Sequence, residues 1–176
     1  MNEIKTLIMD EQAMERAVSR IAFEIIERNK GVEDLCILGI HTRGIVIAKR
    51  IAKKIKEIEN KHIDVGIIDP TPFRDDLSGK DLPLRNFTEI NFEIGDRKVI
   101  LVDDVICTGR TIRAAIDAIM NLGRPKTIQL AVLIDRGHRE LPIRPDFVGK
   151  NVPTSKNEKV KVLVEEFDQK NKVVIV

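Results

Sequence analysis

Apolar residues along the chain follow two alternating periods, which predicts alternating helices and strands. Helical spacing runs through 10–31, where Met14, Val18, Ile21 and Ile25 share one face, and it returns in 44–58 and 111–122. Short apolar runs predict buried strands between these helices, at 35–40, 63–68, 98–102 and 127–134. Strands that alternate with helices imply βαβ units, so we expect an α/β fold with a mostly parallel central sheet flanked by helices.

The rest of the chain departs from this alternation. The segment 69–86 holds three Pro, one Gly and many charged residues, which is typical of a lid or binding loop. Alternating apolar residues in 88–94 predict a strand or β-ribbon arm. A short strand is expected near Phe147, and two closing strands are expected over 160–167 and 172–176.

Composition narrows the class of protein without identifying a function. The 176 residues suit one domain over 1–176, and 43% hydrophobic residues is too apolar for a disordered chain. No apolar run is long enough to span a membrane and no apolar signal core follows Met1, so we expect a cytoplasmic protein. Cys36 and Cys107 have no metal or redox spacing and the three His are scattered, so no metal held directly by the protein is expected.

The strongest chemical signal is the run of thirteen residues from Val99 to Thr111. Four apolar residues lead to two adjacent carboxylates, and a Gly-containing turn then opens a helix. A helix start of this kind suits a phosphate, and paired carboxylates beside it suit ribose hydroxyls or Mg²⁺ through water. A lone acid pair would more often cap the helix or pair with Arg110 and Arg113, but the combined pattern favours a phosphoribosyl site. The run in full is Val99, Ile100, Leu101, Val102, Asp103, Asp104, Val105, Ile106, Cys107, Thr108, Gly109, Arg110, Thr111.

These thirteen residues resemble the phosphoribosyl-pyrophosphate (PRPP) motif of the type I phosphoribosyltransferases. The similarity is closest to a group in that family which both regulates pyrimidine genes and acts as a uracil phosphoribosyltransferase. Four other stretches of the chain carry it, at 9–13, 40–44, 73–77 and 135–155. The resemblance implies a type I phosphoribosyltransferase fold with a flexible β-arm or lid loop at about 69–90 and a small C-terminal hood.

The resemblance also implies a reaction, in which uracil and PRPP give UMP and pyrophosphate with Mg²⁺ as the cofactor that accompanies PRPP. The catalytic residues would be Asp103, Asp104 and Arg43, with one of the two acids bridged to Mg²⁺ by water. The other roles it implies are a pyrophosphate loop at Thr42, Arg43 and Gly44, a lid at Arg74, Asp75, Asp76 and Arg85, and a uracil region at Asp135, Arg136, Gly137 and His138. Relatives usually carry Lys at the position of His41 and Tyr or Phe at that of Cys107.

The second implied activity is UMP-responsive binding of pyrimidine operon leader mRNA, by which the family attenuates transcription. Charge along the chain offers an independent hint: segments 41–61 and 124–161 each carry a net charge of +5 around a middle segment of −4. Phe23 lies opposite the apolar stripe of its helix, where it could stack on an RNA base or contact a partner helix. The RNA residues implied by the resemblance are Ser19, Arg20, Phe23, Arg28, Arg139, Arg144 and Lys150.

The resemblance implies a homodimer or a homohexamer, and no membrane partner is expected. Two other readings stay open at this point. The chain could be an RNA-binding regulator whose nucleotide site only senses, which tight UMP binding without turnover would reveal. It could also be a purine phosphoribosyltransferase with an incidental basic surface, although the stretch 136–144 argues against this.

Overall fold

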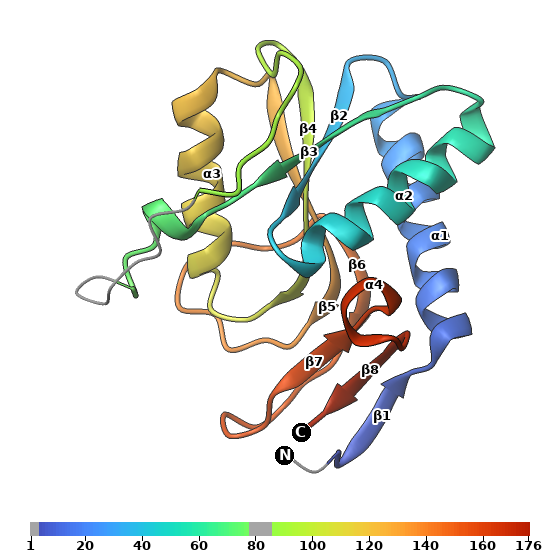
Figure 1. Cartoon of the computed structure of the whole chain (residues 1–176), viewed down its shortest axis with the longest axis vertical. Coiled ribbons are helices and arrows are strands. Elements are labelled where there is room, and N and C mark those ends of the chain that lie inside the picture. Colours follow the sequence, from blue (N-terminus) through green and yellow to red (C-terminus); the bar gives the residue numbers. More distant parts are fainter. Residues whose placement is uncertain (1–3, 78–85) are drawn as a thin grey trace.

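The computed structural model describes residues 4–77 and 86–176, and its centre is a five-stranded parallel sheet (Figure 1). The strands lie in the order β3-β2-β4-β5-β6, and every neighbouring pair is parallel. Their bounds are β2 Leu35–Ile40, β3 Asp64–Ile68, β4 Lys98–Ile106, β5 Thr127–Asp135 and β6 Phe147–Asn151. The predicted α/β class with a mostly parallel central sheet is therefore confirmed.

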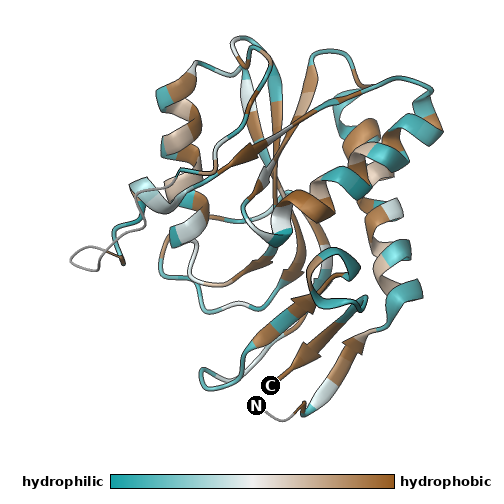
Figure 2. Ribbon diagram, in the orientation of Figure 1, coloured by the Kyte–Doolittle hydropathy of each residue, from teal (hydrophilic) through white to brown (hydrophobic). Residues whose placement is uncertain are grey.

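Helices cover both faces of this sheet. The helices α1 (Glu11–Asn29) and α2 (Arg43–Glu59) pack on one face, and α3 (Arg110–Leu122) packs on the other. Side chains of a strand point alternately to the two faces, so Ile100 and Val102 of β4 join the core beneath α1 and α2, whereas Val99 and Leu101 join the core beneath α3. Figure 2 shows the apolar residues gathered along the strands and the polar ones on the outer faces of the helices.

The sequence predicts Asp10 as the cap at the start of helix α1 and Gly31 as the cap at its end; the structure confirms Asp10 and places the C-cap one residue earlier, at Lys30. The Oδ1 atom of Asp10 accepts a hydrogen bond from the backbone N–H of Ala13 at 2.8 Å, so Asp10 is the N-cap. The residue that leaves the helix in the left-handed conformation is Lys30, at φ 55°, and Gly31 follows it at φ 115°. The chain turn that we assigned to Gly31 is therefore shared between two residues.

A second, three-stranded antiparallel sheet lies below the first in Figure 1, and it contains one strand from the N-terminal end of the chain and two from the C-terminal end. Its order is β1-β8-β7, with β1 Thr6–Met9, β8 Lys172–Ile175 and β7 Val160–Leu163. The predicted strand over 160–167 is wrong in its second half, where the short helix α4 (Glu165–Asp168) follows β7. The carboxylate of Asp168 accepts a hydrogen bond from the N–H of Val164 at 3.0 Å, which closes this turn. We call β7, α4 and β8 the hood.

The predicted arm over 88–94 does not form a strand or ribbon. Only one isolated bridge, between Ile67 and Glu89, joins this segment to the sheet. Ile90 and Phe92 pack against the core beneath α3, and Ile94 is buried in it, so apolar packing replaces strand pairing. A short 3₁₀ turn, Thr71–Phe73, precedes it.

Strand β4 is longer than predicted, because it continues past Val102 to Ile106. Pairing with β5 persists through this extension, where Asp103 lies opposite Val132 and Val105 lies opposite Ile134. The two predicted site carboxylates are therefore part of the strand and not of the loop beyond it.

The start of α2 packs closely against the sheet, and two glycines permit this close approach. A Cβ atom added to Gly39 in β2 would lie 2.4 Å from Cα of Ile45, and one added to Gly44 would lie 2.7 Å from the carbonyl oxygen of Val102. Contacts this short do not occur between real side chains and backbone. Glycine at both positions therefore sets the distance between α2 and the strand that carries the acid pair.

We expect Gly39→Ala to destabilise the fold, because the new methyl group would collide with rigid helix backbone. The free energy of unfolding should fall by about 2 kcal/mol or more, which lowers the melting temperature by roughly 4–8 °C. Thermal unfolding followed by circular dichroism measures this. Gly95→Ala is the matched control, since no atom lies within 4 Å of the added Cβ there. Equal melting temperatures for both variants would contradict the close approach.

Candidate functional site

The acid pair Asp103 and Asp104 occupies the carboxyl-terminal part of β4. Asp103 is only 7% exposed, and its Oδ1 atom accepts a hydrogen bond from the N–H of Asp104 at 2.9 Å. Burial, and then the charge of Asp104, raise the pKa of Asp103 well above its ordinary value, and burial also raises the pKa of Asp104. Arg74 and Arg43 act in the opposite direction on Asp103 and Asp104 respectively. The pair is thus buried at Asp103 and half-buried at Asp104, and charge on it is costly unless a ligand compensates it.

The predicted pyrophosphate loop lies beside this pair, at the entrance to α2. The peptide bond between His41 and Thr42 is cis, and Thr42 precedes the first residue of the helix. The Cβ atom that Gly44 lacks would stand 3.2 Å from Cα of Asp103, so the loop and the acids are in direct contact. A cavity of about 260 Å³ is lined by Ile40, His41, Thr42, Arg43, Asp103, Asp104, Val105 and Thr111. The structure thereby brings together the loop, the acid pair and the start of α3.

Arg43 has a partner that the sequence pattern does not reveal. Its Nε and Nη2 atoms donate to the Asp168 carboxylate of α4 at 3.2 and 2.7 Å. Hydrogen bonding to Arg43 lowers the pKa of Asp168. A second cavity of about 330 Å³ is lined by Arg43, Asp104, Asp168 and the residues of β7. No periodicity or motif signals Asp168, because 125 residues separate it from Arg43.

The turn from Cys107 to Thr111 has the form expected of a phosphate-binding helix start. Gly109 adopts φ 90°, which only glycine takes up without strain, and α3 begins at the next residue. The Oγ1 atom of Thr108 accepts a hydrogen bond from the N–H of Arg110 at 3.2 Å. The next two N–H groups of the first turn, those of Thr111 and Ile112, have no partner within the helix, so they are available to an anion at this end.

The base of the predicted lid is joined to α3 by charge. Arg74 pairs with Asp76, and Asp75 accepts a hydrogen bond from Arg110 at 2.7 Å. The positive charge of Arg74 also acts on Asp103, so this residue lies close to the acid pair. Arg85, the fourth predicted lid residue, lies outside the described residues.

Asp69 holds the two ends of the lid segment together. Its carboxylate accepts hydrogen bonds from the N–H groups of Thr71 at 3.0 Å and Phe87 at 3.1 Å, and its own N–H donates to Thr88 at 3.0 Å. Burial by itself raises the pKa of Asp69, but these hydrogen bonds and the nearby His41 outweigh it and lower the pKa. His41 stacks on Phe87 with ring centroids 4.3 Å apart. The pyrophosphate loop therefore touches the far end of the lid segment.

The four residues predicted for uracil line one cavity of about 510 Å³ at the end of β5. Its lining is Asp135, Arg136, Gly137, His138, Arg139, Asn151, Pro153 and Thr154. The side chain of Arg139 donates to the carboxylate of Asp135 at 2.6 Å and to the carbonyl oxygen of Cys107 at 2.8 Å. This arginine, which we grouped with the RNA residues, therefore joins the uracil region to the phosphate turn.

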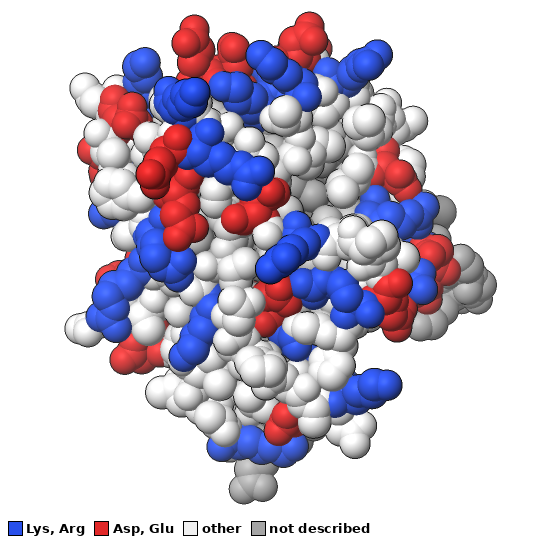
Figure 3. All heavy atoms as spheres, turned by 180° about the vertical axis from the view of Figure 1, so that it is seen from behind, with Lys and Arg blue, Asp and Glu red and all other residues white. Residues whose placement is uncertain are grey.

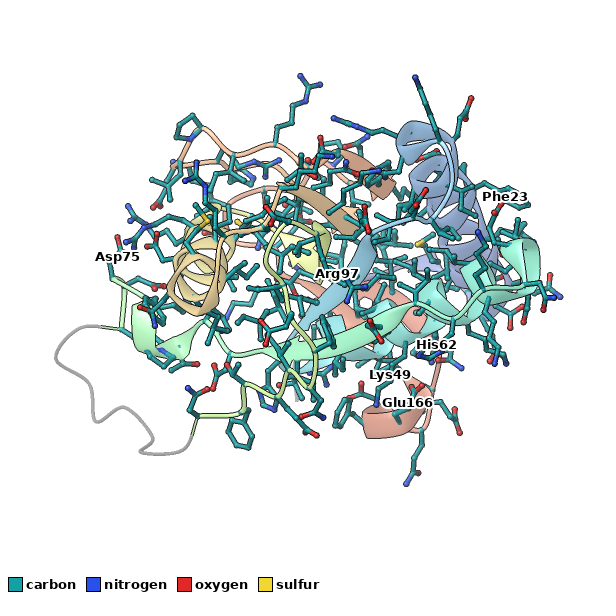
Figure 4. All side chains as sticks on the ribbon, turned by 90° about the horizontal axis from the view of Figure 1, so that it is seen from above. Phe23, Lys49, His62, Asp75, Arg97 and Glu166 are labelled. Carbon is teal, nitrogen blue, oxygen red and sulfur yellow. The ribbon has the colours of Figure 1, made fainter. Side chains whose placement is uncertain are left out.

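Most of the other predicted RNA residues lie along the seam between α1 and β6. Arg20 donates to the carbonyl oxygens of Val148 at 3.1 Å and Gly149, and Arg28 pairs with Asp146 at 3.0 Å. Phe23 is 55% exposed, and Figure 4 shows it by α1, across the molecule from Asp75. Arg144 and Lys150 are exposed and Ser19 is half-buried. Seen from behind, basic side chains are interspersed with acidic ones and form no uninterrupted patch (Figure 3).

Within residues 4–77 and 86–176, no group of three or more His, Cys, Asp or Glu side chains is arranged to hold a metal ion. None of the helices in those ranges is both long enough and apolar enough to cross a membrane.

Comparison with known proteins gives consistent results. The profile of the phosphoribosyl transferase domain matches residues 6–168. "Bifunctional protein PyrR" of Acetivibrio thermocellus is 61% identical over 97% of this chain and 94% of its own length, and that of Bacillus subtilis is 58% identical over 97% and 96%. A hypoxanthine-guanine phosphoribosyltransferase from Bacillus anthracis superposes with a TM-score of 0.77 over 99% of both chains at 20% identity. That last likeness shows the fold alone.

We expect Asp103→Asn to stabilise the protein at neutral pH, because it removes a buried charge next to Asp104. The pKa of Asp103 is raised on folding, so its ionisation costs stability as the pH rises through that pKa. The gain should therefore be present at pH 7 and shrink below the ordinary pKa of about 4, where the carboxyl is neutral in both states. Thermal unfolding of both proteins from pH 3 to 8 measures it. The exposed acid of the Arg113–Asp117 pair provides the control, Asp117→Asn. Destabilisation by Asp103→Asn at pH 7 would contradict the raised pKa.

Proposed function

We propose that this chain is a uracil phosphoribosyltransferase that also binds RNA, because it belongs to the phosphoribosyl transferase domain family and, within it, to the bifunctional PyrR proteins. In the proposed reaction uracil and PRPP give UMP and pyrophosphate, and UMP promotes binding to pyrimidine leader mRNA to attenuate transcription. The observation that carries the enzymatic half is the cavity in which the acid pair, the loop at the start of α2 and Thr111 of α3 meet.

The proposed chemistry needs binding and orientation more than covalent participation by the protein. The bond at the anomeric carbon of ribose breaks through a state with positive charge on the sugar, which nearby carboxylates stabilise. Asp103 and Asp104 accept hydrogen bonds from the ribose hydroxyls, and the first-turn N–H groups of α3 hold the 5′-phosphate. Thr42, Arg43 and Gly44 receive the departing pyrophosphate, whose negative charge the guanidinium of Arg43 balances.

Mg²⁺ fits this site as a companion of PRPP. The acid pair borders the cavity, and the described residues form no cluster of three ligands, so the ion would be held by PRPP and reach Asp103 or Asp104 through water. When bound, it neutralises part of the charge on the pyrophosphate group. The protein itself orients the sugar and the base.

The base is proposed to lie in the cavity at the end of β5, against residues 135–138. Gly137 adopts φ 75° and its N–H donates to the Asp135 carboxylate at 2.9 Å, so the backbone that borders the cavity is held in a fixed arrangement. The solved purine enzymes share only the fold with this chain, whereas the two PyrR relatives are 58% and 61% identical to it over nearly its whole length. This favours uracil over a purine. The name of these relatives, "Bifunctional protein PyrR", and the match to the phosphoribosyl transferase domain favour turnover over a site that only senses.

RNA is proposed to bind along the seam between α1 and β6, where Phe23 could stack on an unpaired base and Arg20, Arg28, Arg144 and Lys150 could contact phosphates. Arg139 bonds to the carbonyl oxygens of both Cys107 and Ile143 at 2.8 Å, so it connects the phosphate turn to the segment that leads to Arg144. This contact offers a route from bound UMP to the RNA surface. We also propose that the protein is cytoplasmic and acts as a homodimer or homohexamer.

Asp104→Asn should lower kcat/KM for UMP formation about 10- to 100-fold, because a charged hydrogen bond to the ribose is lost. The assay is UMP formation from uracil and PRPP with Mg²⁺. The change should leave the melting temperature equal to or above that of the wild type. Asp117→Asn, on the exposed face of α3, should retain wild-type turnover. Unchanged turnover in Asp104→Asn would remove the acid pair from the proposed site.

Arg144→Gln should weaken RNA binding several-fold and reduce its salt dependence by about one phosphate contact, because an exposed cation is lost. Gel shifts with a pyrimidine leader hairpin, with and without UMP at several salt concentrations, measure this. UMP formation should be unaffected. Arg124→Gln changes another exposed arginine, which lies beyond the C-terminus of α3, and should retain full RNA affinity. Equal losses in both variants would mean that the contact is only a general effect of charge.

A further inference from the structure

We propose that Asp168 of the hood is a positioning residue for PRPP and pyrophosphate, which acts by holding the guanidinium of Arg43 in its binding orientation. The inference rests on the proposed phosphoribosyltransferase function and extends it to a part of the chain that carries none of the recognised motifs. It assigns the hood a role in the chemistry of the leaving group, at a site 125 residues further along the chain from the loop.

The contact has the geometry of a paired, oriented ion bridge. Nε and Nη2 of Arg43 meet both oxygens of one carboxylate, at 3.2 and 2.7 Å, so the plane of the guanidinium is set and not only its distance. Asp168 is itself held, because its Oδ2 atom accepts the N–H of Val164 at 3.0 Å. The side chains are 36% and 18% exposed, so the pair is shielded from solvent more than an ordinary surface bridge.

The hydrogen bonds of Arg43 show whether Asp168 orients its guanidinium for an anion or occupies the donors that the anion would need. A guanidinium has five N–H donors, and the bond to Asp168 uses the edge formed by Nε and Nη2. Within residues 4–77 and 86–176, no partner occupies the edge formed by Nη1 and Nη2, and this edge can bind a phosphate with two parallel hydrogen bonds. Because Arg43 lines both the cavity of the acid pair and the cavity beneath β7, this edge serves an anion that lies beside Asp104.

The same short helix contains a natural comparison for Asp168. Glu166 pairs with Arg50 of α2 at 2.9 Å, so α4 is joined to α2 by two carboxylates (Figure 4 shows Glu166). Only Asp168 reaches the residue at the start of α2, in the pyrophosphate loop; Arg50 lies seven residues further along the helix. A role limited to fastening the hood would be shared by both acids, whereas a positioning role belongs to Asp168 alone.

The test compares Asp168→Asn, Asp168→Glu and Glu166→Gln with the wild-type protein. The Asn side chain keeps an oxygen that can accept the N–H of Val164, but it lacks the charge and the second acceptor. We expect Asp168→Asn to raise KM for PRPP about 5- to 20-fold and to leave KM for uracil within about twofold. Asp168→Glu should recover most of the loss, and Glu166→Gln should leave both constants unchanged. Titration calorimetry with PRPP and Mg²⁺, and with pyrophosphate and Mg²⁺, should show the same weakening, scaled to the folded fraction.

Four results from the variants would overturn the inference. An unchanged KM for PRPP in Asp168→Asn would show that Arg43 does not need the hood, and a lowered KM would show that Asp168 competes with the anion. Equal changes in both constants, or equal effects of Asp168→Asn and Glu166→Gln, would indicate a purely structural bridge. The wild-type protein separates this inference from the function on which it rests. A wild-type protein that neither binds PRPP nor forms UMP refutes both. An active wild-type protein whose KM for PRPP is unchanged by Asp168→Asn refutes only the positioning role.

Discussion

The close approach of α2 to the carboxyl half of β4 is the constraint on which the site depends. Gly44 lies against the carbonyl oxygen of Val102, at a distance that no side chain could share. Because the helix cannot move away, the loop at its start is held beside the acid pair. Every other part of the site, from Thr111 to the hood, is arranged around that fixed distance. The close packing at Gly39 and Gly44 thus places the loop that contains Arg43 beside the acid pair.

The buried acid pair illustrates how stability is exchanged for function. Burial and mutual repulsion raise the pKa of Asp103, so its charged form costs the fold free energy when no ligand is bound. A sugar with hydroxyl donors, together with a cation carried by the substrate, would stabilise the charged acids on binding and offset this cost. The positive charges of Arg74 and Arg43 act to lower the pKa of Asp103 and of Asp104 respectively, and they reduce this cost without cancelling it. Such a balance is expected at a site that must accept and release a highly charged substrate.

The proposed RNA surface and the nucleotide site are linked by one segment of chain. It leaves β5 at Asp135, passes Arg139 and Ile143, and reaches α1 through the ion pair between Arg28 and Asp146. Hydrogen bonds of Arg139 and the ion pair of Asp146 hold this segment at both ends. The interspersed charges in Figure 3 indicate that RNA recognition would depend on placed side chains and not on a large basic field.

The sequence by itself determined the alternation of helices and strands, the motif from Val99 to Thr111 and the family, because these depend on local periodicity and on contiguous residues. It misplaced what non-local packing decides. The alternating residues of 88–94 pack as a coil against the core beneath α3, and 165–168 forms a short helix whose acids Asp168 and Glu166 pair with Arg43 and Arg50 of α2. Likewise, only the tertiary structure could bring Asp168 to Arg43 or turn Arg139 inward to Cys107. A sequence pattern contains information on neighbouring residues, whereas contacts between residues far apart in the chain depend on how the elements pack.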